Sequence, residues 1–476
     1  MSTSVSTGPK TGIADLSVEL LTRIFTFYAH QKKQSNFKGL ETRMFTSIPD
    51  GYPSNPTILS HVCKHWRAVS IAIPTLWSTI VSQRPIPSHV DMAKLWLERS
   101  GTSPLTLHIF QTIPDDGTPV EYMKTERQAA NDLLKLFMEQ MERWQNVKFF
   151  LCIGPLPAFE NFPQDRFPLL KNASLNLATW TPMKAEWVDR VFRAVHSAPC
   201  IESVTWNASF YLDGLPSHVP WQRLKHFELD LNDVSEDPSP LSYVFDTLSK
   251  CPQVESIKFT LAMALKPVPR SPPQPVTFVN LKKLVLDEAL PSHLISLLKF
   301  ITAPALEELR ISLHPEEIRS PPALAQTLGE FISRSKCTIT NLGLDLDEAQ
   351  AVKILPLPGL KSLEVLFLGG TKSKQTVTLL TRATGKKVSS NILPKLQYLH
   401  FVYQLDTYRP HTITAPVNSI RQMINSRTRA RDGPLPPPDL NYLRRMTLGS
   451  NGTFQIARVY AELDDVDTPF FGLSAA

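Results

Sequence analysis

The sequence predicts an α/β fold built from repeated strand and helix units. A six-residue pattern recurs from about residue 143: an apolar residue, two variable residues, an apolar residue, one variable residue and a last apolar residue. Apolar residues at the fourth and sixth positions are typical of a short strand that buries one face. The copies are WQNVKF (144–149), a weaker LKNASL (from Leu170), IESVTW (201–206), LKHFEL (224–229), VESIKF (254–259), LKKLVL (281–286), LEELRI (306–311), ITNLGL (339–344), LEVLFL (363–368), LQYLHF (396–401) and LRRMTL (443–448).

The segments between the copies have helical spacing. Many of the 41 prolines fall just after these segments, where a helix has to end before the next strand. Strand and helix in alternation predict a curved parallel sheet with outer helices. The series begins with residues 88–110, in which Ser88 can cap a helix, Gly101 can end it and LTLHI is a strand. Further helices are expected at 187–199, 241–252, 294–304 and 324–335.

The length of the repeat narrows the fold class. From Trp144 to Leu396, nine intervals cover 252 residues, a mean of 28. This resembles leucine-rich repeats, which have about 20 to 29 residues. The asparagine or cysteine that such repeats carry at a fixed offset is missing, so irregular repeats are expected. The resemblance implies a leucine-rich-repeat horseshoe. The Pro-rich segments 266–275 and 427–438 are expected to be loops.

Composition restricts the function classes. The net charge is 50 − 44 = +6 with both signs interspersed, which gives no argument for a nucleic-acid or membrane partner. Five cysteines that never form a CxxC pair indicate free thiols in a reducing compartment. The start lacks an apolar signal region and no long apolar run follows, so we expect an intracellular protein, cytoplasmic or nuclear.

A separate helical segment is expected ahead of the repeats. Residues 13–28 have the spacing of an amphipathic helix that Asp15 or Ser17 can cap, and ILSHVCKHWRAVSIA (58–72) has the spacing of a second helix. The polar segment near 31–56 between them is expected to be a mobile loop. Two helices of this size bury too little apolar surface to fold alone, so they need the repeats or a partner.

These two helices carry a resemblance. DLSVELLTRIF and VCKHWRAVSIAIPTLW resemble an F-box, whose pattern is LPxELLxxIF, a short connection and VCxxWxxLxxxxxLW. The segment WLERSGTSPLTL (96–107) is similar to the one that follows the F-box in many fungal F-box-like proteins. Ser17 replaces the usual proline, and the connection between the helices is longer than usual. The resemblance implies a tail at 1–11, an F-box head at 12–82 and a repeat body at 83–476.

The F-box resemblance also implies partners. The head would dock onto a Skp-family adaptor and through it onto a cullin, as part of a ubiquitin ligase, while the body would bind a protein substrate. The alternative is a repeat scaffold outside any ligase, whose head only caps the repeats. The expected adaptor-binding residues are Leu16, Leu20, Leu21, Ile24, Phe25, Val62, Cys63, Trp66, Leu76 and Trp77.

Metal and catalytic sites are not expected. His61, Cys63 and His65 are two residues apart on a predicted helix, whereas a helical zinc pair needs a spacing of three or four. His61 and His65 have that spacing, but two ligands do not make a site. The chain has no GxSxG, HExxH, GxGxxG or complete phosphate-loop motif. We therefore expect no cofactor and no catalytic residue.

Substrate binding is expected on the face of the sheet that points away from the helices. The fifth position of each copy lies on that face: Lys148, Ser174, Thr205, Glu228, Lys258, Val285, Arg310, Gly343, Phe367, His400 and Thr447. Aromatic and arginine side chains are common anchors of interfaces. The expected substrate contacts are Lys258, Arg310, Phe367 and His400, with the alternative that Phe367 turns inward.

Overall fold

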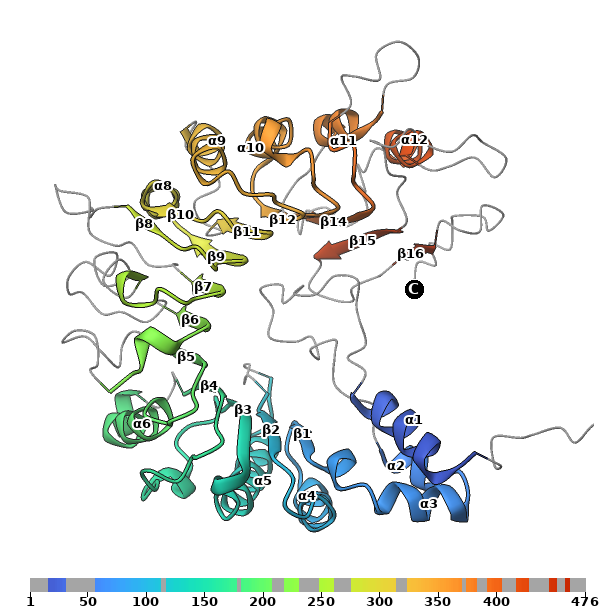
Figure 1. Cartoon of the computed structure of the whole chain (residues 1–476), viewed down its shortest axis with the longest axis vertical. Coiled ribbons are helices and arrows are strands. Elements are labelled where there is room, and N and C mark those ends of the chain that lie inside the picture. Colours follow the sequence, from blue (N-terminus) through green and yellow to red (C-terminus); the bar gives the residue numbers. More distant parts are fainter. Residues whose placement is uncertain are drawn as a thin grey trace, which may run out of the picture. The chain divides into compact units, whose positions relative to one another are not determined.

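The computed structural model of the chain describes residues 16–30, 56–112, 117–177, 181–207, 218–230, 248–260, 275–313, 323–369, 374–382, 392–404, 417–427, 445–451 and 459–462. The fold is α/β, with a large and mostly parallel sheet (Figure 1). It divides into two compact units, residues 1–206 with 218–220 and residues 207–217 with 221–476. The expected loops at 31–55, 266–274 and 428–438, and most of the expected helix 241–252, lie outside the described residues.

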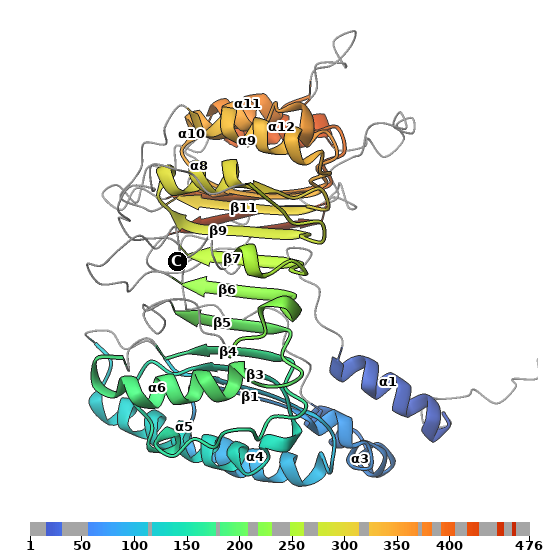
Figure 2. The same cartoon turned by 60° about the vertical axis from the view of Figure 1, so that its left-hand side comes forward.

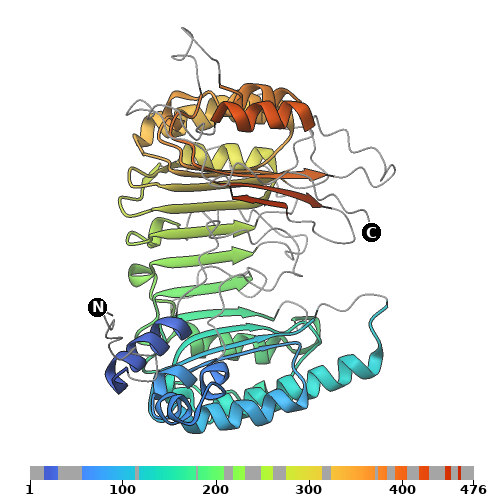
Figure 3. The ribbon, with the colours of Figure 1, turned by 90° about the vertical axis from the view of Figure 1, so that its right-hand side faces the viewer.

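The first unit begins with helical elements and continues as a parallel sheet. Its strands pair in chain order, and in β2 the residues Leu105, Leu107 and Ile109 are fully buried between half-buried neighbours. Its longer helices lie on one face of these strands (Figure 3). The elements are α1 (Val18–His30), α2 (Thr57–Ser60), α3 (Lys64–Ile71), η2 (Pro74–Trp77), β1 (Thr79–Gln83), α4 (Pro87–Arg99), β2 (Leu105–Phe110), α5 (Val120–Met138), η3 (Met141–Arg143), β3 (Trp144–Phe150), η4 (Pro157–Phe159), β4 (Asn172–Asn176), α6 (Thr181–His196) and β5 (Ser203–Asn207).

The second unit repeats this arrangement. In the main sheet, its described strands β6, β7, β9 and β11 to β15 also run parallel, and β16 is antiparallel to its neighbour β15. The arrows of β6, β7, β9 and β11 point to the same side in Figure 2. The elements are η7 (Trp221–Arg223), β6 (His226–Asp230), β7 (Ser256–Thr260), β8 (Val276–Thr277), β9 (Lys283–Ala289), α8 (Pro291–Phe300), β10 (Ile301–Thr302), β11 (Glu308–Leu313), α9 (Ala323–Ser335), β12 (Asn341–Asp345), α10 (Glu348–Ile354), η8 (Pro358–Leu360), β13 (Val365–Gly369), α11 (Lys374–Leu380), β14 (Tyr398–Gln404), α12 (Val417–Arg427), β15 (Arg445–Asn451) and β16 (Val459–Glu462).

A shared carbonyl sets the register of successive strands. In seven of the described copies, the carbonyl of the second pattern residue accepts hydrogen bonds from the second and third residues of the next copy. The carbonyl of Lys282, for example, accepts from Glu307 N and Glu308 N, both at 2.9 Å. The same double acceptance occurs at Lys171, Lys225, Glu255, Glu307, Thr340 and Glu364. These N–O distances are nearly constant, although the number of residues between successive copies varies. The first residues of neighbouring strands are therefore aligned, whatever the length of the segment between them.

The prolines before the strands occupy a recurring turn. In four repeats, the amide of the first pattern residue donates to the carbonyl three residues earlier, at 3.2–3.3 Å. Proline is the second residue of each turn, where its fixed φ favours the bend. These turns are Ala198–Ile201, Cys251–Val254, Ala303–Leu306 and Leu393–Leu396. The sequence placed the prolines between helix and strand, and the hydrogen bonds supply the physical reason.

Arginines near helix ends satisfy carbonyls of the preceding repeat. Arg334 Nη2 donates to Leu298 O at 2.6 Å and Ile301 O at 2.8 Å. The fully buried Arg427 donates to Leu380 O, Leu393 O and Ile392 O at 2.5–3.2 Å. A helix that ends without continuing leaves carbonyls without amide partners, so these guanidinium groups complete the hydrogen bonding between repeats.

Several element boundaries differ from the expected ones. Helix α4 begins at Pro87 after Ile86, which gives no side-chain cap, so Ser88 is not the cap. Helix α8 ends at Phe300, because Ile301–Thr302 pair with Val276–Thr277 as a separate two-stranded sheet. Strand β1 was not expected, and it spans the predicted head–body boundary between residues 82 and 83.

Replacing Arg427 tests the role of these guanidinium groups. Arg427→Met leaves up to three buried carbonyls without a donor, so the free energy of unfolding of the second unit should fall by about 3 kcal/mol. The measurement is the denaturant midpoint followed by circular dichroism. Arg223→Met, at an exposed position, should change it by less than about 0.5 kcal/mol. Equal effects of the two substitutions would refute the role.

Candidate interaction surfaces

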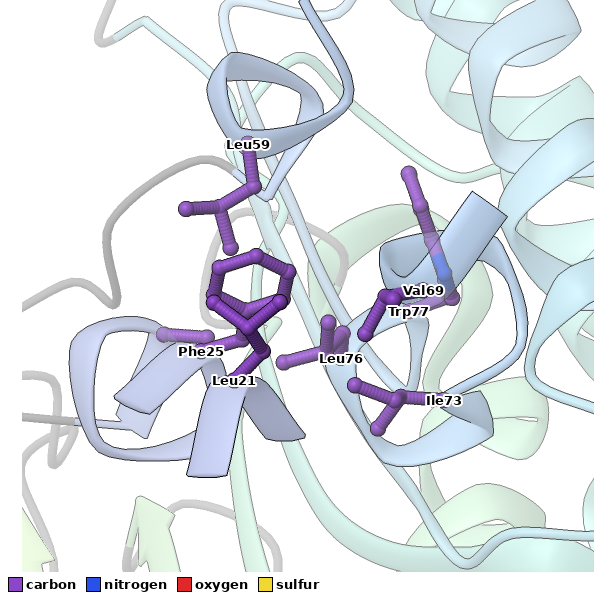
Figure 4. Packing of buried hydrophobic residues seen from close by; sticks show 8 residues of the cluster. Leu21, Phe25, Leu59, Val69, Ile73, Leu76 and Trp77 are labelled. Carbon is purple, nitrogen blue, oxygen red and sulfur yellow. The ribbon is translucent and has the colours of Figure 1, made fainter. Parts of the chain in front are cut away.

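The helical elements before β1 form a compact core, which we call the head core. It contains Leu21, Phe25 and Ala29 from α1 together with Leu59, Val69, Ile73, Leu76 and Trp77 (Figure 4). Ser17 caps α1 as expected, since its Oγ accepts from Leu20 N at 3.4 Å. The indole of Trp77 is fully buried and donates to Ser70 O at 2.9 Å.

The ten predicted adaptor contacts separate into two groups. Leu21, Phe25, Leu76 and Trp77 are buried in the head core, and Leu16 and Trp66 pack against it partly buried. The Trp66 ring lies 4.8 Å from the Phe25 ring. The side chains that face solvent are Leu20, Ile24, Val62 and Cys63.

Helix α1 has a second apolar face, which we call the outer stripe. Leu20, Ile24 and Phe27 follow one another at helical spacing and are 48%, 43% and 67% exposed. Phe27 was not among the predicted contacts, nor was Ile58 of α2, which is also exposed. The outer stripe is about 100° around the helix from Leu21 and Phe25, so the same spacing could have revealed it.

The segment 58–72 is two helices and not one. Helix α2 ends at Ser60, and Cys63 is the extended N-cap residue of α3, its Sγ accepting from Trp66 N at 3.4 Å. The prediction of a single helix over 58–72 is therefore wrong. His61, Cys63 and His65 do not share a helix, and the described part of the chain contains no group of three or more potential metal ligands.

The head core continues into the first helix of the repeats. Trp96 of α4 packs edge-on against Trp77, with 5.6 Å between ring centroids, and the Arg99 guanidinium lies 4.5 Å from the Trp77 centroid. Ser78 alone separates η2 from β1, and its carbonyl accepts from Thr106 N of β2. The head therefore covers the β1 end of this sheet.

The predicted substrate residues share one row of the second unit's sheet. The strand register aligns Glu228, Lys258, Val285, Arg310, Gly343, Phe367, His400 and Thr447 in that order. Likewise, Lys148, Ser174 and Thr205 align in the first unit. The alignment predicted from the sequence pattern is confirmed within each unit.

Ion pairs dominate the part of this row on β6 to β11. Lys258 Nζ lies 2.5 Å from Glu228 Oε1 and 4.0 Å from Asp287 Oδ2. Arg310 Nη2 lies 2.9 Å from Glu308 Oε1, which also pairs with Lys283 at 3.3 Å. These charges are partly buried and already neutralised by neighbours, so Lys258 and Arg310 contribute to the register of the sheet as well as to its surface.

The row becomes aromatic on β13 and β14. Phe367 is half-buried and stacks on His400, with ring centroids 4.9 Å apart and planes 11° apart. His400 is only 8% exposed, so it supports Phe367 and offers little surface of its own. A Cβ on Gly343 would lie 3.0 Å from Arg310 Cγ, so the space left by this glycine is filled by the arginine stem.

A buried polar cluster follows β2 and β3 in the first unit. Glu126 Oε1 accepts from Thr112 N at 2.7 Å, Gln111 Oε1 accepts from Ile153 N at 3.0 Å, and the Cys152 thiol donates to Thr112 O at 3.0 Å. Burial raises the pKa of Glu126, and burial raises the pKa of the Cys152 thiol to about 12. A thiol that stays protonated is a poor nucleophile. The side chains of Glu126, Gln111 and Cys152 instead fix the backbone of the loops after β2 and β3 through these hydrogen bonds.

The buried carboxyl gives a pH-dependent stability. Because the folded state raises the pKa of Glu126 above its ordinary value of about 4.3, the folded state keeps this proton to higher pH than the unfolded state. Ionisation therefore lowers stability as the pH rises through the folded pKa. Glu126→Gln keeps an oxygen acceptor but cannot ionise. Its free energy of unfolding relative to wild type should increase from about pH 4 upward, as measured by denaturant titration at several pH values. A difference that stays constant with pH would contradict this.

Comparisons with protein-family models and with curated proteins found no match to the chain. Among the described helices, none combines the length and apolar character needed to cross a membrane.

Proposed function

We propose that the chain is the substrate-receptor subunit of a Skp–cullin–F-box ubiquitin ligase. The F-box-like head would dock onto a Skp-family adaptor in the cytoplasm or nucleus, and a leucine-rich-repeat horseshoe would bind a protein substrate. Ligation would be catalysed by the partner subunits, so this chain would need no catalytic residue. The observation that carries the proposal is the outer stripe of α1.

The energetics of α1 favours a partner on the outer stripe. One apolar face of this helix is already buried in the head core, so folding of the head does not require a second one. Burying a large apolar side chain contributes about 1.5 to 3 kcal/mol. Leu20 and Ile24 are about half exposed, and Phe27 is about two-thirds exposed. Covering all three would therefore add about 2 to 4 kcal/mol, enough to anchor a helical interface.

Two features of the repeats support a binding role for the body. The shared carbonyls align the strands at a mean repeat length close to that of leucine-rich repeats. The aligned row offers one face with half-buried Lys258, Arg310 and Phe367, on every second strand from β7 to β13 of the sheet. A broad, aligned side-chain surface of this kind suits a protein segment better than a small molecule.

The packing of Trp77 against Trp96 and Arg99 favours a second candidate. In that case the head serves only to cover the β1 end of the sheet, and the chain is a repeat scaffold that belongs to no ligase. The two functions are compatible with the same core. They differ in whether the outer stripe has a partner, so binding of a Skp adaptor separates them.

The central test is a charge placed in the outer stripe. Ile24→Asp should reduce binding of a Skp-family adaptor to the intact chain by at least about tenfold, because the carboxylate would have to be buried in an apolar interface. Binding is measured by titration calorimetry. Ile24 is a better position for this test than Trp66, because Trp66→Ala would also remove a contact to Phe25 in the head core.

The matched control is Met92→Asp on α4. Met92 is 43% exposed, the same as Ile24, and lies outside the head. The Met92→Asp variant should bind the adaptor with wild-type affinity. Both variants should keep the thermal unfolding transition of the wild-type protein. Wild-type affinity for Ile24→Asp, or equal losses for both variants, would contradict docking through the outer stripe.

A second test addresses the substrate surface. Phe367→Ala removes the half-buried ring that stacks on His400, and the proteins that co-purify with the intact chain should change while adaptor binding persists. Phe110→Ala makes the same truncation at a half-buried position on the first unit's sheet and should leave the co-purifying proteins unchanged. If Phe367→Ala leaves them unchanged too, the substrate does not use this part of the row.

A further inference from the structure

A second surface of the second unit is set by the turns that lead into its strands. Strands β6 to β14 are parallel, so these turns share one edge of the sheet (Figure 2). Six exposed cations lie in or beside them: Arg223, Lys250, Lys282, Lys336, Lys361 and Lys395. The half-buried Lys225 adds a seventh, whereas the carboxylates along the same edge are Glu255, Glu307 and Glu364. We call this the basic edge.

The basic edge is most uniform over its last three strands. Lys336, Lys361 and Lys395 precede β12, β13 and β14, which are direct neighbours in the sheet. Glu364 is the carboxylate beside these three strands, which leaves a net charge of 3 − 1 = +2. Beside β6, β7, β9 and β11, four cations and two carboxylates also leave 4 − 2 = +2, and Lys282 Nζ lies 2.9 Å from Glu255 Oε2. The net positive charge per strand is therefore somewhat higher beside β12 to β14.

The spacing of charge decides between two kinds of anionic partner. Strands lie about 4.8 Å apart, so the edge from β6 to β14 is about 29 Å long. The seven cations exceed the three carboxylates by four, which gives about one net positive charge per 7 Å of edge. Double-stranded DNA presents one negative charge per about 1.7 Å. Alternate residues of an extended peptide are about 6.6 to 7 Å apart. The edge therefore matches a peptide with a carboxylate at every second residue.

We propose that the basic edge binds an extended acidic segment of a partner protein, which crosses the strands from β6 toward β14. This does not depend on docking of the head. The carboxylates Glu255, Glu307 and Glu364 along the edge also disfavour a continuous phosphate backbone, which would approach each of them. An acidic segment with gaps between its charges avoids this repulsion.

The test uses the intact chain and a fluorescent peptide in which glutamate alternates with serine. Binding is followed by anisotropy at low and moderate salt. Lys336→Glu, Lys361→Glu and Lys395→Glu combined should weaken binding by at least about tenfold, and added salt should weaken binding to wild type. The matched control combines Lys94→Glu, Lys124→Glu and Lys135→Glu at exposed positions on α4 and α5, which changes the net charge by the same amount. It should alter binding by less than about threefold.

Three outcomes would overturn the proposal. The first is that the two triple variants weaken binding of the glutamate peptide equally, and the second is that wild type shows no measurable binding of the peptide. The third is that wild type binds a DNA duplex more tightly than the peptide at the same salt concentration, and that the Lys336, Lys361 and Lys395 variant loses affinity for the duplex to the same extent. Thermal unfolding of each variant, and a parallel set with lysine replaced by glutamine, separate lost charge from lost folding. In the glutamine set an intermediate loss of affinity is expected.

Discussion

A backbone carbonyl that recurs in seven of the described repeats imposes the order on which the rest of the structure depends. It belongs to the second residue of the six-residue pattern and accepts two amides from the next copy, at 2.7–3.1 Å from Lys171 to Glu364. Side chains at this position alternate in sign through Lys225, Glu255, Lys282 and Glu307, so neighbouring strands also attract one another. With their starts aligned, parallel strands bring equivalent residues into rows. Both the row of residues from Glu228 to Thr447 and the basic edge follow from that alignment.

The head depends on a different constraint, the burial of Trp77. Its indole is enclosed by the head core, hydrogen-bonded to Ser70 and flanked by Trp96 and Arg99 of α4. This arrangement uses one face of α1 and leaves Leu20, Ile24 and Phe27 outside. The apolar surface of α1 is thus wider than its own fold requires. An excess of this kind is characteristic of a helix with a further partner.

The strands of the repeats were predictable because their alternation of apolar residues is strong. Strand β1 was not predicted, because its sixth pattern position is Ser82 and not an apolar residue. The buried Ser82 hydroxyl hydrogen-bonds His89 Nδ1 at 2.9 Å. The interruption between helices α2 and α3 at Cys63 was not predicted, because a thiol is an unusual helix cap. Helical spacing predicted one apolar stripe on α1 and did not separate the buried residues Leu21 and Phe25 from the exposed residues Leu20 and Ile24. Which face is buried depends on α3 and η2, and tertiary packing of this kind is not encoded in the spacing of one helix.

Amide hydrogen exchange of the intact chain, measured with and without a Skp-family adaptor, can show whether the head is the docking module. Added adaptor should slow exchange in Val18–His30 and Thr57–Ile71, because binding on the outer stripe suppresses local opening of the head. Exchange in strands β6 to β14 should stay the same. Unchanged exchange in the head at saturating adaptor, or protection confined to the repeats, would contradict the assignment of the head as the docking module.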